Sequence, residues 1–163
     1  MRERSAGSYV PGLLDRLMGT RGAGPAASRL SLEQLKDAVA RDLEDLLNTR
    51  VALPEALLRA YPECAASILN YGLVDFAGCC LSSTEDRLRI CASLKSAIEH
   101  HEPRLRGVQA RLEPRAGSVN RVDFIITAML HVHPAHEPIN FDAVLQPSTL
   151  HYSINRSARG VSA

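Results

Sequence analysis

The chain has 163 residues, of which 45% are hydrophobic and 23% are charged, a composition typical of one globular domain with a buried core. Its 19 basic and 18 acidic residues leave a formal net charge of +1, which argues against nucleic-acid binding because such surfaces are strongly basic. No apolar run approaches the roughly 20 residues of a membrane span, and no secretory signal is visible, so we expect a cytoplasmic protein without direct membrane insertion.

The first segment, residues 1–30, is predicted to be a flexible tail that carries a short docking motif. Its stretch GTRGAGPAAS is rich in glycine and lacks hydrophobic periodicity, as linkers do. Just before that stretch, the segment PGLLDRLM places Leu13, Leu14 and Leu17 at helical spacing. One or two helical turns are unstable alone in water, so the motif is a frayed end, a segment packed on its own domain, or a helix that forms on a partner.

Two amphipathic helices are predicted from their start signals. The first covers residues 31–48 and opens with an S-x-x-Q capping box of Ser31 and Gln34. The second begins at Ser82 or Ser83, with a capping box of Ser82 and Glu85, and stops at Glu102 because the following proline disfavours helical geometry. The inner stripe of this second helix is expected to contain Leu88, Cys91, Leu94 or Lys95, and Ile98. Between the two helices we predict short helical pieces near 54–60 and 63–70, and then a turn with Gly72 as a helix C-cap.

After the second helix the hydrophobic period changes to that of strands. The alternating apolar residues are Val108, Ala110 and Leu112, then Val122 to Val132 at every second position, then Ile139, Phe141, Ala143 and Leu145, and last Leu150, Tyr152 and Ile154. Strands spaced this closely pair antiparallel. The order of elements therefore predicts an α+β fold, in which N-terminal helices pack on one face of a C-terminal antiparallel sheet of three to four strands. We expect one domain over 31–155 and a polar tail over 156–163.

The junction between the second helix and the first strand carries Glu102, Pro103 and Arg104. The proline favours extended backbone, and residues two apart in extended backbone point to the same side, so the carboxylate and the guanidinium should lie together. Three interpretations are open. The pair is an ion pair within the chain that fixes the corner, a rigid docking point for a partner, or part of a catalytic site.

The catalytic interpretation meets two difficulties. Glycoside hydrolysis needs two facing carboxylates, one of which must hold a proton, and an adjacent arginine favours the ionised form of Glu102. No second carboxylate is placed to face it, because Glu99 lies one helical turn earlier. No known catalytic triad or phosphate-binding motif occurs either. We therefore predict no catalytic residues and no cofactor.

Histidines and cysteines are the candidate metal ligands. His131 and His133 are two apart on a predicted strand and would share a face, with His136 as a third ligand after the intervening proline. Such histidines are more often solvated strand residues. The four cysteines lack the spacing of zinc ligands and are expected to be reduced thiols, mostly buried. We predict no metal site. A sheet edge without covering elements could instead accept a strand from another chain.

Several segments taken together resemble one known family. These are LLDRL at 13–17, RDLEDLLNTR at 41–50, SILNYGL at 67–73, RLRICASLKSAIEHHEPRL at 87–105 and INFDAVLQPST at 139–149. They resemble the TssE family of type VI secretion baseplate wedge subunits, which is similar to a phage-tail baseplate wedge protein whose family carries a "lysozyme-like" label. Glu-Pro-Arg is the signature of that family and falls on Glu102, Pro103 and Arg104, although an aromatic residue commonly stands where this chain has His101.

The resemblance implies a structural protein rather than an enzyme. Its partners would be the baseplate proteins TssF, TssG and TssK and the contractile sheath proteins TssB and TssC, in a baseplate docked at the inner membrane. A strand edge within 104–155 would pair with the first sheath ring and help to start its polymerisation. Partner-binding residues would be Glu102, Pro103 and Arg104 at the corner and Leu13, Leu14 and Leu17 in the tail. The alternative function is that of a lysozyme-like peptidoglycan hydrolase.

Overall fold

The computed structural model describes residues 9–18, 29–65, 67–76, 78–80, 83–113, 121–133, 135–146 and 148–157. Its elements are α1 (Leu13–Met18), α2 (Leu32–Asn48), α3 (Glu55–Ala60), α4 (Pro62–Ala65), the 3₁₀ helix η1 (Ile68–Asn70), α5 (Thr84–His101), β1 (Leu105–Glu113), β2 (Val122–Val132), β3 (Ala135–Gln146) and β4 (His151–Arg156). The chain divides into two units that meet inside α2, one ending at Asp42 and the other starting at Leu43, and each is described by itself.

The first unit contains α1 and the first part of α2. The capping box predicted for α2 is confirmed, since the Gln34 amide donates to Ser31 Oγ at 3.2 Å and the Ser31 amide donates to Gln34 Oε1 at 2.8 Å. Two backbone hydrogen bonds, of 3.2 and 2.8 Å, join Tyr9 to Leu30 on either side of the segment that contains α1. The helical spacing predicted around Leu13 is also confirmed, as these residues form α1.

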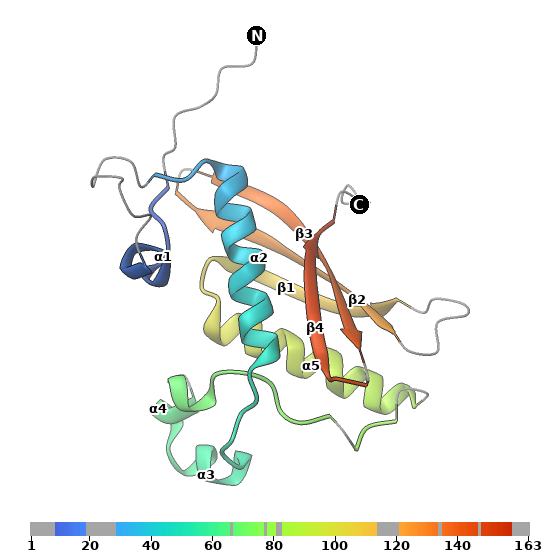
Figure 1. Cartoon of the computed structure of the whole chain (residues 1–163). Helices are drawn as coiled ribbons and strands as arrows, with labels where there is room; N and C mark the ends of the chain where they lie inside the picture. Colours follow the sequence, from blue (N-terminus) through green and yellow to red (C-terminus); the bar gives the residue numbers. More distant parts are fainter. Residues whose placement is uncertain are drawn as a thin grey trace. The chain divides into compact units, whose positions relative to one another are not determined.

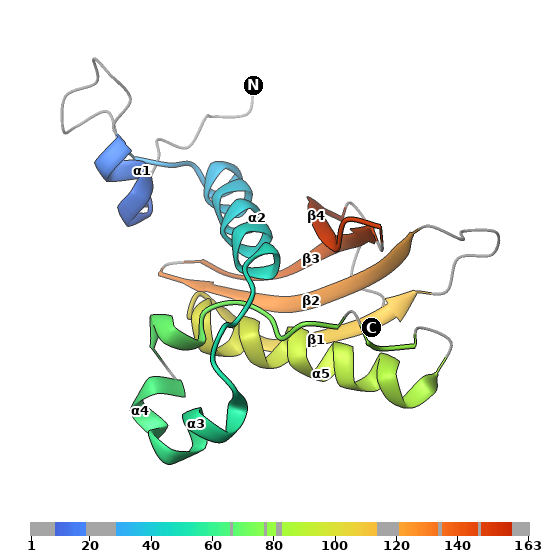
Figure 2. The same ribbon diagram turned by 60° about the horizontal axis from the view of Figure 1, so that its bottom comes forward.

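The second unit is built on a four-stranded sheet with the order β1-β2-β3-β4, in which every neighbouring pair is antiparallel (Figure 1). Helices therefore come first in the chain and an antiparallel sheet comes last, which confirms the predicted α+β class. Helix α5 runs alongside β1, the strand that follows it directly (Figure 2). The corner between α5 and β1 is the site of the Glu-Pro-Arg sequence.

The core of this unit is apolar and contains side chains from α5 and the sheet. On α5 the buried residues are Ile90, Leu94 and Ile98, which recur every four positions along one stripe. On the sheet the buried set includes Leu105, Val108, Phe124, Ile126, Leu130, Phe141 and Tyr152. The prediction that Leu88 belongs to the inner stripe was wrong: it is 66% exposed, because it lies about 200° around the helix from Ile90.

In the helical half, the start of α5 agrees with one of its two predicted positions, whereas the predicted role of Gly72 was wrong. The N-cap of α5 is Ser83, whose hydroxyl accepts from the Asp86 amide at 3.4 Å, while Ser82 lies outside the described residues. The C-cap of η1 is Tyr71, so Gly72 is not a cap. A side chain at Gly72 would place its Cβ 2.5 Å from the Thr49 carbonyl oxygen, and the residue has a φ of +120°. Glycine is required there for the close approach of two backbone segments.

The strands also depart from strict alternation. A β-bulge interrupts the pairing of β1 with β2 between Arg106 and Gln109, where Gly107 has a φ of +61°. Leu150, which we predicted to lie in the last strand, instead occupies the turn before β4 with a φ of 54°. His133 lies in the turn after β2, so it does not share a strand face with His131.

Candidate docking corner and groove

The corner begins where α5 ends. Glu102 is the C-cap residue with φ −121° and ψ 80°, and its amide still donates to the Ile98 carbonyl at 2.8 Å. The Leu105 amide then donates to the Glu102 carbonyl at 3.0 Å, and β1 starts at that residue. The predicted end of the helix at Glu102 is confirmed, because helical backbone is disfavoured at the residue before a proline.

Glu102 and Arg104 form an ion pair within the chain at this corner. Arg104 Nε donates to Glu102 Oε1 at 2.6 Å, Arg104 Nη2 donates to Glu102 Oε2, and the Arg104 amide donates to Oε1 at 3.2 Å. The Glu102 residue is only 4% exposed, whereas 25% of the Arg104 side chain is exposed. The pair is therefore a bidentate ion pair, called the clip below, which fixes the geometry of the corner between α5 and β1. Its binding to a partner stays a prediction.

This geometry is unfavourable for acid catalysis at Glu102. Both of its oxygens accept N–H donors of Arg104, so the carboxylate serves as a hydrogen-bond acceptor within the chain. Glu99, the second carboxylate considered from the sequence, is exposed and lies 4.0 Å from Lys95 Nζ. The two carboxylates are thus each paired with a cation of their own, and neither is set up as a proton donor to a sugar.

His101 joins the corner to the segment that precedes α5. Its Nε2 lies 3.0 Å from the Asn70 carbonyl oxygen, and its ring meets the Tyr71 ring edge-on at a centroid distance of 5.3 Å. Burial lowers the pKa of His101, and the neighbouring His100 lowers it further. The neutral imidazole is therefore favoured in a position where it packs against an aromatic ring.

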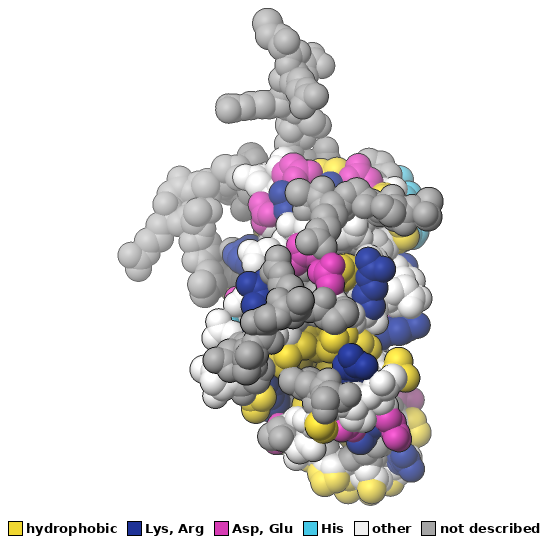
Figure 3. All heavy atoms as spheres, turned by 90° about the vertical axis from the view of Figure 1, so that its right-hand side faces the viewer, with side chains coloured by type: hydrophobic (Ala, Val, Ile, Leu, Met, Phe, Trp, Pro, Cys, Tyr) yellow, Lys and Arg dark blue, Asp and Glu magenta, His cyan; other side chains and the backbone are white. Residues whose placement is uncertain are grey.

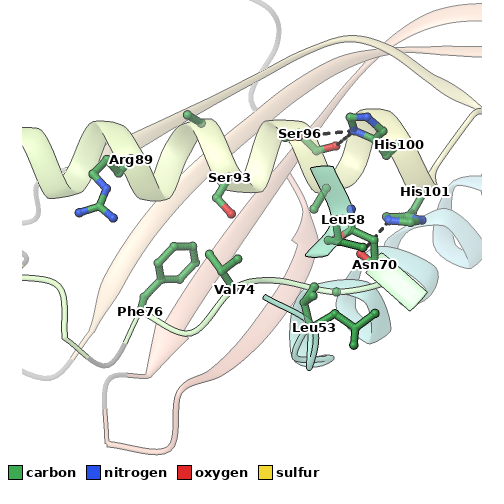
Figure 4. A pocket seen from close by; sticks show the side chains of 14 residues that line it. Leu53, Leu58, Asn70, Val74, Phe76, Arg89, Ser93, Ser96, His100 and His101 are labelled. Atoms are coloured by element: carbon green, nitrogen blue, oxygen red, sulfur yellow. Dashed lines mark hydrogen bonds between the residues drawn. The ribbon is translucent and has the colours of Figure 1, made fainter. Parts of the chain in front are cut away.

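A groove of about 470 Å³ lies between α5 and the chain from Val51 to Phe76 (Figure 4). One wall is made by small side chains of α5, and the opposite wall by larger apolar ones, as seen for Leu53, Leu58, Val74 and Phe76. The α5 wall consists of Ala92, Ser93, Ser96 and Ala97, with Arg89 near one end and His100 near the other. Such a groove is suited to apolar side chains of a ligand or a partner.

Reasoning from the sequence did not identify this groove. Its signal was present in α5, where small residues recur at positions four apart beside the stripe of Ile90 and Leu94. A row of small side chains on a helix allows another segment to come close. The wall contributed by Phe76 and Leu53 could not be anticipated, because it depends on how the loop before α5 folds back.

The predicted tail motif presents apolar side chains to solvent. Leu13 is 70% exposed and Leu17 is 73% exposed, four residues apart on the same side of α1, while the side chain of Leu14 lies outside the description. Among the described residues of the first unit, none covers this pair of leucines. The interpretation that the motif binds a partner stays a prediction.

The histidine and cysteine candidates are not gathered into a metal site. The ring of His131 contacts that of His136 across the β2–β3 hairpin at a centroid distance of 4.1 Å, while His133 lies in the turn. In the part of the chain that the structure describes, no group of three or more His, Cys, Asp or Glu could hold a metal ion. The expectation that the cysteines are mostly buried was wrong, since three are partly exposed and Cys80 is exposed.

Charges of both signs are mixed on the surface, in line with the formal net charge of +1. On the face shown in Figure 3, Lys and Arg side chains are interspersed with Asp and Glu side chains. Within the described ranges, no helix combines the length and the apolarity needed to cross a bilayer.

Comparison with known proteins identifies one family. The model of the family described as "Baseplate wedge protein gp25" matches residues 33–135. The matched region contains the Glu102–Arg104 corner, the groove, and strands β1 and β2. No curated protein matches the chain.

Proposed function

Because the chain belongs to the baseplate wedge protein gp25 family, we propose that it is the wedge subunit of a type VI secretion baseplate. Membership of the family implies a structural role in a phage tail-like baseplate, assembled with other baseplate proteins. Within that role we propose TssF, TssG and TssK as its neighbours in the wedge, in a cytoplasmic complex docked at the inner membrane. We also propose that its sheet helps the first ring of TssB and TssC sheath subunits to assemble.

The observation that carries the proposal is the rigid corner at Glu102–Arg104. The internal ion pair orients the guanidinium before any partner arrives, so little entropy is lost on binding. Pro103 is exposed at the tip of the corner, and a quarter of the Arg104 side chain is exposed beside it. A partner carbonyl or carboxylate can approach this side, whereas Glu102 is buried and acts through Arg104.

The tail motif is proposed as the second attachment. A helix as short as α1 is unstable alone in water and gains stability when its apolar residues are covered. Leu13 and Leu17 are the residues available for this, and we propose that they bind a groove or helix bundle formed by the neighbouring wedge proteins. This tether would add to the affinity of the corner, since linked contacts reinforce one another.

Co-purification tests the tail most directly. The Leu13→Ala/Leu17→Ala variant should remain folded, because both side chains are exposed, and should lose co-purification with TssF and TssG by at least tenfold. Leu88→Ala is a matched control, since Leu88 is also an exposed leucine on a helix, and it should bind as the wild type does. Equal recovery of both variants with the wedge proteins would refute the tether.

The enzymatic alternative is tested separately. The purified chain is incubated with isolated cell walls, and soluble muropeptides are measured. We expect none above a buffer control, for the wild type and for Glu102→Gln alike, because Glu102 is held as an acceptor by Arg104. Muropeptide release that Glu102→Gln abolishes would replace the structural function with hydrolysis.

A further inference from the structure

The segment between α2 and α5 exposes large apolar side chains on its outer surface. Ile68 is 85% exposed, more than any other large apolar residue that the structure describes. Four more exposed residues of this kind lie in the same segment, namely Leu57, Tyr61, Leu69 and Val74. Single apolar side chains scattered over a surface are ordinary, whereas a concentration of them indicates an interaction site. This segment is therefore a candidate surface for a partner.

The same segment lines the groove against α5. Val74 and Phe76 point across the groove toward Ser93 of α5 (Figure 4). The groove follows α5 from Arg89 to His100, a distance of about 16 Å along the helix axis. That length matches about three turns of a bound helix. The small side chains of α5 along this stretch allow the axis of such a helix to come close.

Several backbone groups that border the groove are already paired. The Val51 amide donates to the Leu73 carbonyl, and the Leu73 amide donates to the Thr49 carbonyl, both at 2.9 Å. The Asn70 carbonyl oxygen lies 3.0 Å from His101 Nε2, and the backbone of α5 is bonded within the helix. An extended segment in the groove would leave its own amide and carbonyl groups without partners, whereas a helix pairs them internally. The groove therefore favours a helix as its occupant.

One end of the groove carries a positive charge. Arg89 is the one arginine or lysine among the described residues that line the groove, and none of those residues is acidic. Arg89 Nη1 lies 3.5 Å from Asp86 Oδ1, while Asp86 Oδ2 accepts from the Cys80 amide at 2.8 Å. A guanidinium has five N–H donors, so the pairing with Asp86 leaves donors for a second carboxylate. A partner with an acidic residue at this end is therefore favoured over one with a basic residue there.

We propose that the groove binds an amphipathic helix of a partner protein, with apolar side chains at positions i, i+4 and i+7 inside the groove and a carboxylate at Arg89. Ile68 and Leu69, which directly precede the groove residue Asn70, extend the contact on the outer surface. This inference rests on the proposed function, in which the helix belongs to a neighbouring wedge protein. It adds a third contact to those proposed for the corner and the tail.

Bulky side chains on α5 test whether the groove is used. Ala92 and Ser96 are exposed, so the Ala92→Tyr/Ser96→Tyr variant should keep its circular dichroism spectrum and its urea unfolding midpoint. Its tyrosines fill the groove, and co-purification with TssF and TssG should fall by about tenfold or more. Leu88→Tyr is the matched control, since Leu88 is exposed on α5 but does not line the groove, and it should bind as the wild type does. Wild-type recovery of the folded double variant would overturn the proposal.

Charge reversal at Arg89 tests the chemistry of the partner. Arg89→Glu should lower the same co-purification by about tenfold or more, because it brings two carboxylates together. Its unfolding midpoint should hardly change, since exposed ion pairs such as that with Asp86 contribute little to stability. Lys95→Glu is the matched control, because Lys95 also pairs with an acidic residue of α5, Glu99 at 4.0 Å, but does not line the groove. Equal recovery of the two variants would contradict the assigned carboxylate.

Photo-crosslinking identifies the occupant and its conformation. A photo-crosslinking residue at Ser93 or at Ser96, both of which line the groove, should capture a wedge protein in full assemblies. The captured positions, identified by mass spectrometry, should lie three or four residues apart, as on one face of a helix. Captured positions two residues apart would assign an extended segment to the groove. A crosslinked homodimer, or a crosslink within the chain, would assign the groove to this protein itself, and each of these outcomes would overturn the inference.

A charge exchange with the partner separates this inference from the proposed function. In the captured helix, the acidic residue nearest Arg89 is changed to arginine, which should restore co-purification of Arg89→Glu. Absence of any restoration would overturn the contact between Arg89 and a carboxylate, and would leave the wedge assignment intact. Failure of the wild-type chain to co-purify with TssF and TssG would instead refute the proposed function.

Discussion

Removal of the Arg104 side chain is the sharpest test of the corner as an internal clip. In Arg104→Ala, the carboxylate of Glu102 stays in a site that is only 4% exposed and loses both side-chain donors. The backbone amide of residue 104 still donates to it. Breaking a buried ion pair on one side costs about 3–5 kcal/mol.

The expected loss lies at the lower end of that range. A quarter of the Arg104 side chain is exposed, so water can enter when it is removed and can hydrate part of the carboxylate. We therefore expect the free energy of unfolding to fall by about 3 kcal/mol, a large share of the 5–15 kcal/mol typical of a domain. Arg104→Lys keeps the charge but not the two-pronged geometry, and should cost about 1–2 kcal/mol.

A double variant separates the clip from simple packing. Glu102→Gln/Arg104→Ala removes the buried charge together with its partner, so it should be more stable than Arg104→Ala alone. The assay is urea unfolding of the full chain at pH 7, followed by far-ultraviolet circular dichroism. A loss below about 1 kcal/mol in Arg104→Ala, or a double variant less stable than the single one, would refute the clip.

Three further changes test other parts of the molecule. Tyr152→Phe removes a buried hydroxyl that has no hydrogen-bond partner in the described structure, so stability at pH 7 should stay the same or rise by up to about 1 kcal/mol. Burial raises the pKa of Tyr152 to about 12, so the folded chain keeps a proton that the unfolded chain releases near pH 10. Stability of the wild type should therefore fall between pH 10 and 12 by more than that of the phenylalanine variant, and parallel curves would contradict this. Gly72→Ala should lower the unfolding free energy by at least about 2 kcal/mol, because its Cβ would lie 2.5 Å from the Thr49 carbonyl oxygen at a φ of +120°. Thermal unfolding measures that loss, and an unchanged midpoint would show that the loop can shift. Burial lowers the pKa of His101 below 6.5, so the unfolded chain binds the proton more readily. The free energy of unfolding should consequently keep its full value above pH 6.5 and decrease as the pH falls below 6.5. The decrease should be weaker in His101→Phe. An equal decrease in the wild type and in this variant would assign the pH dependence to other groups.

Local chemistry explains what reasoning from the sequence predicted correctly. The start of α2 follows from Ser31 and Gln34, which are three residues apart, and the end of α5 follows from the proline at the next position but one. The adjacency of Glu102 and Arg104 has the same origin, since residues two apart in extended backbone share a side. Each of these effects acts within about one helical turn, so no distant residue had to be known.

Predictions failed where a distant residue decides the outcome. Gly72 was predicted from its neighbours to be a cap, but its conformation is required by the backbone of Thr49. The bulge at Gly107 is a different case, because a glycine inside an alternating strand pattern is itself a local signal for a bulge. The hydrogen bonds between the Asn48 side chain and the backbone of Tyr152 in β4 join residues that are 104 positions apart in the chain.

The amino-acid sequence by itself determined the class of fold, the family and the pairing of a carboxylate with a guanidinium across one proline. Only the tertiary structure decided that Glu102 is buried while Arg104 stays partly accessible, and that side chains near the end of α2 hydrogen-bond the backbone of β4. The physical reason is that periodicity and spacing report which residues share a face or a turn. Burial and hydrogen-bond saturation depend instead on which distant element comes to lie against that face.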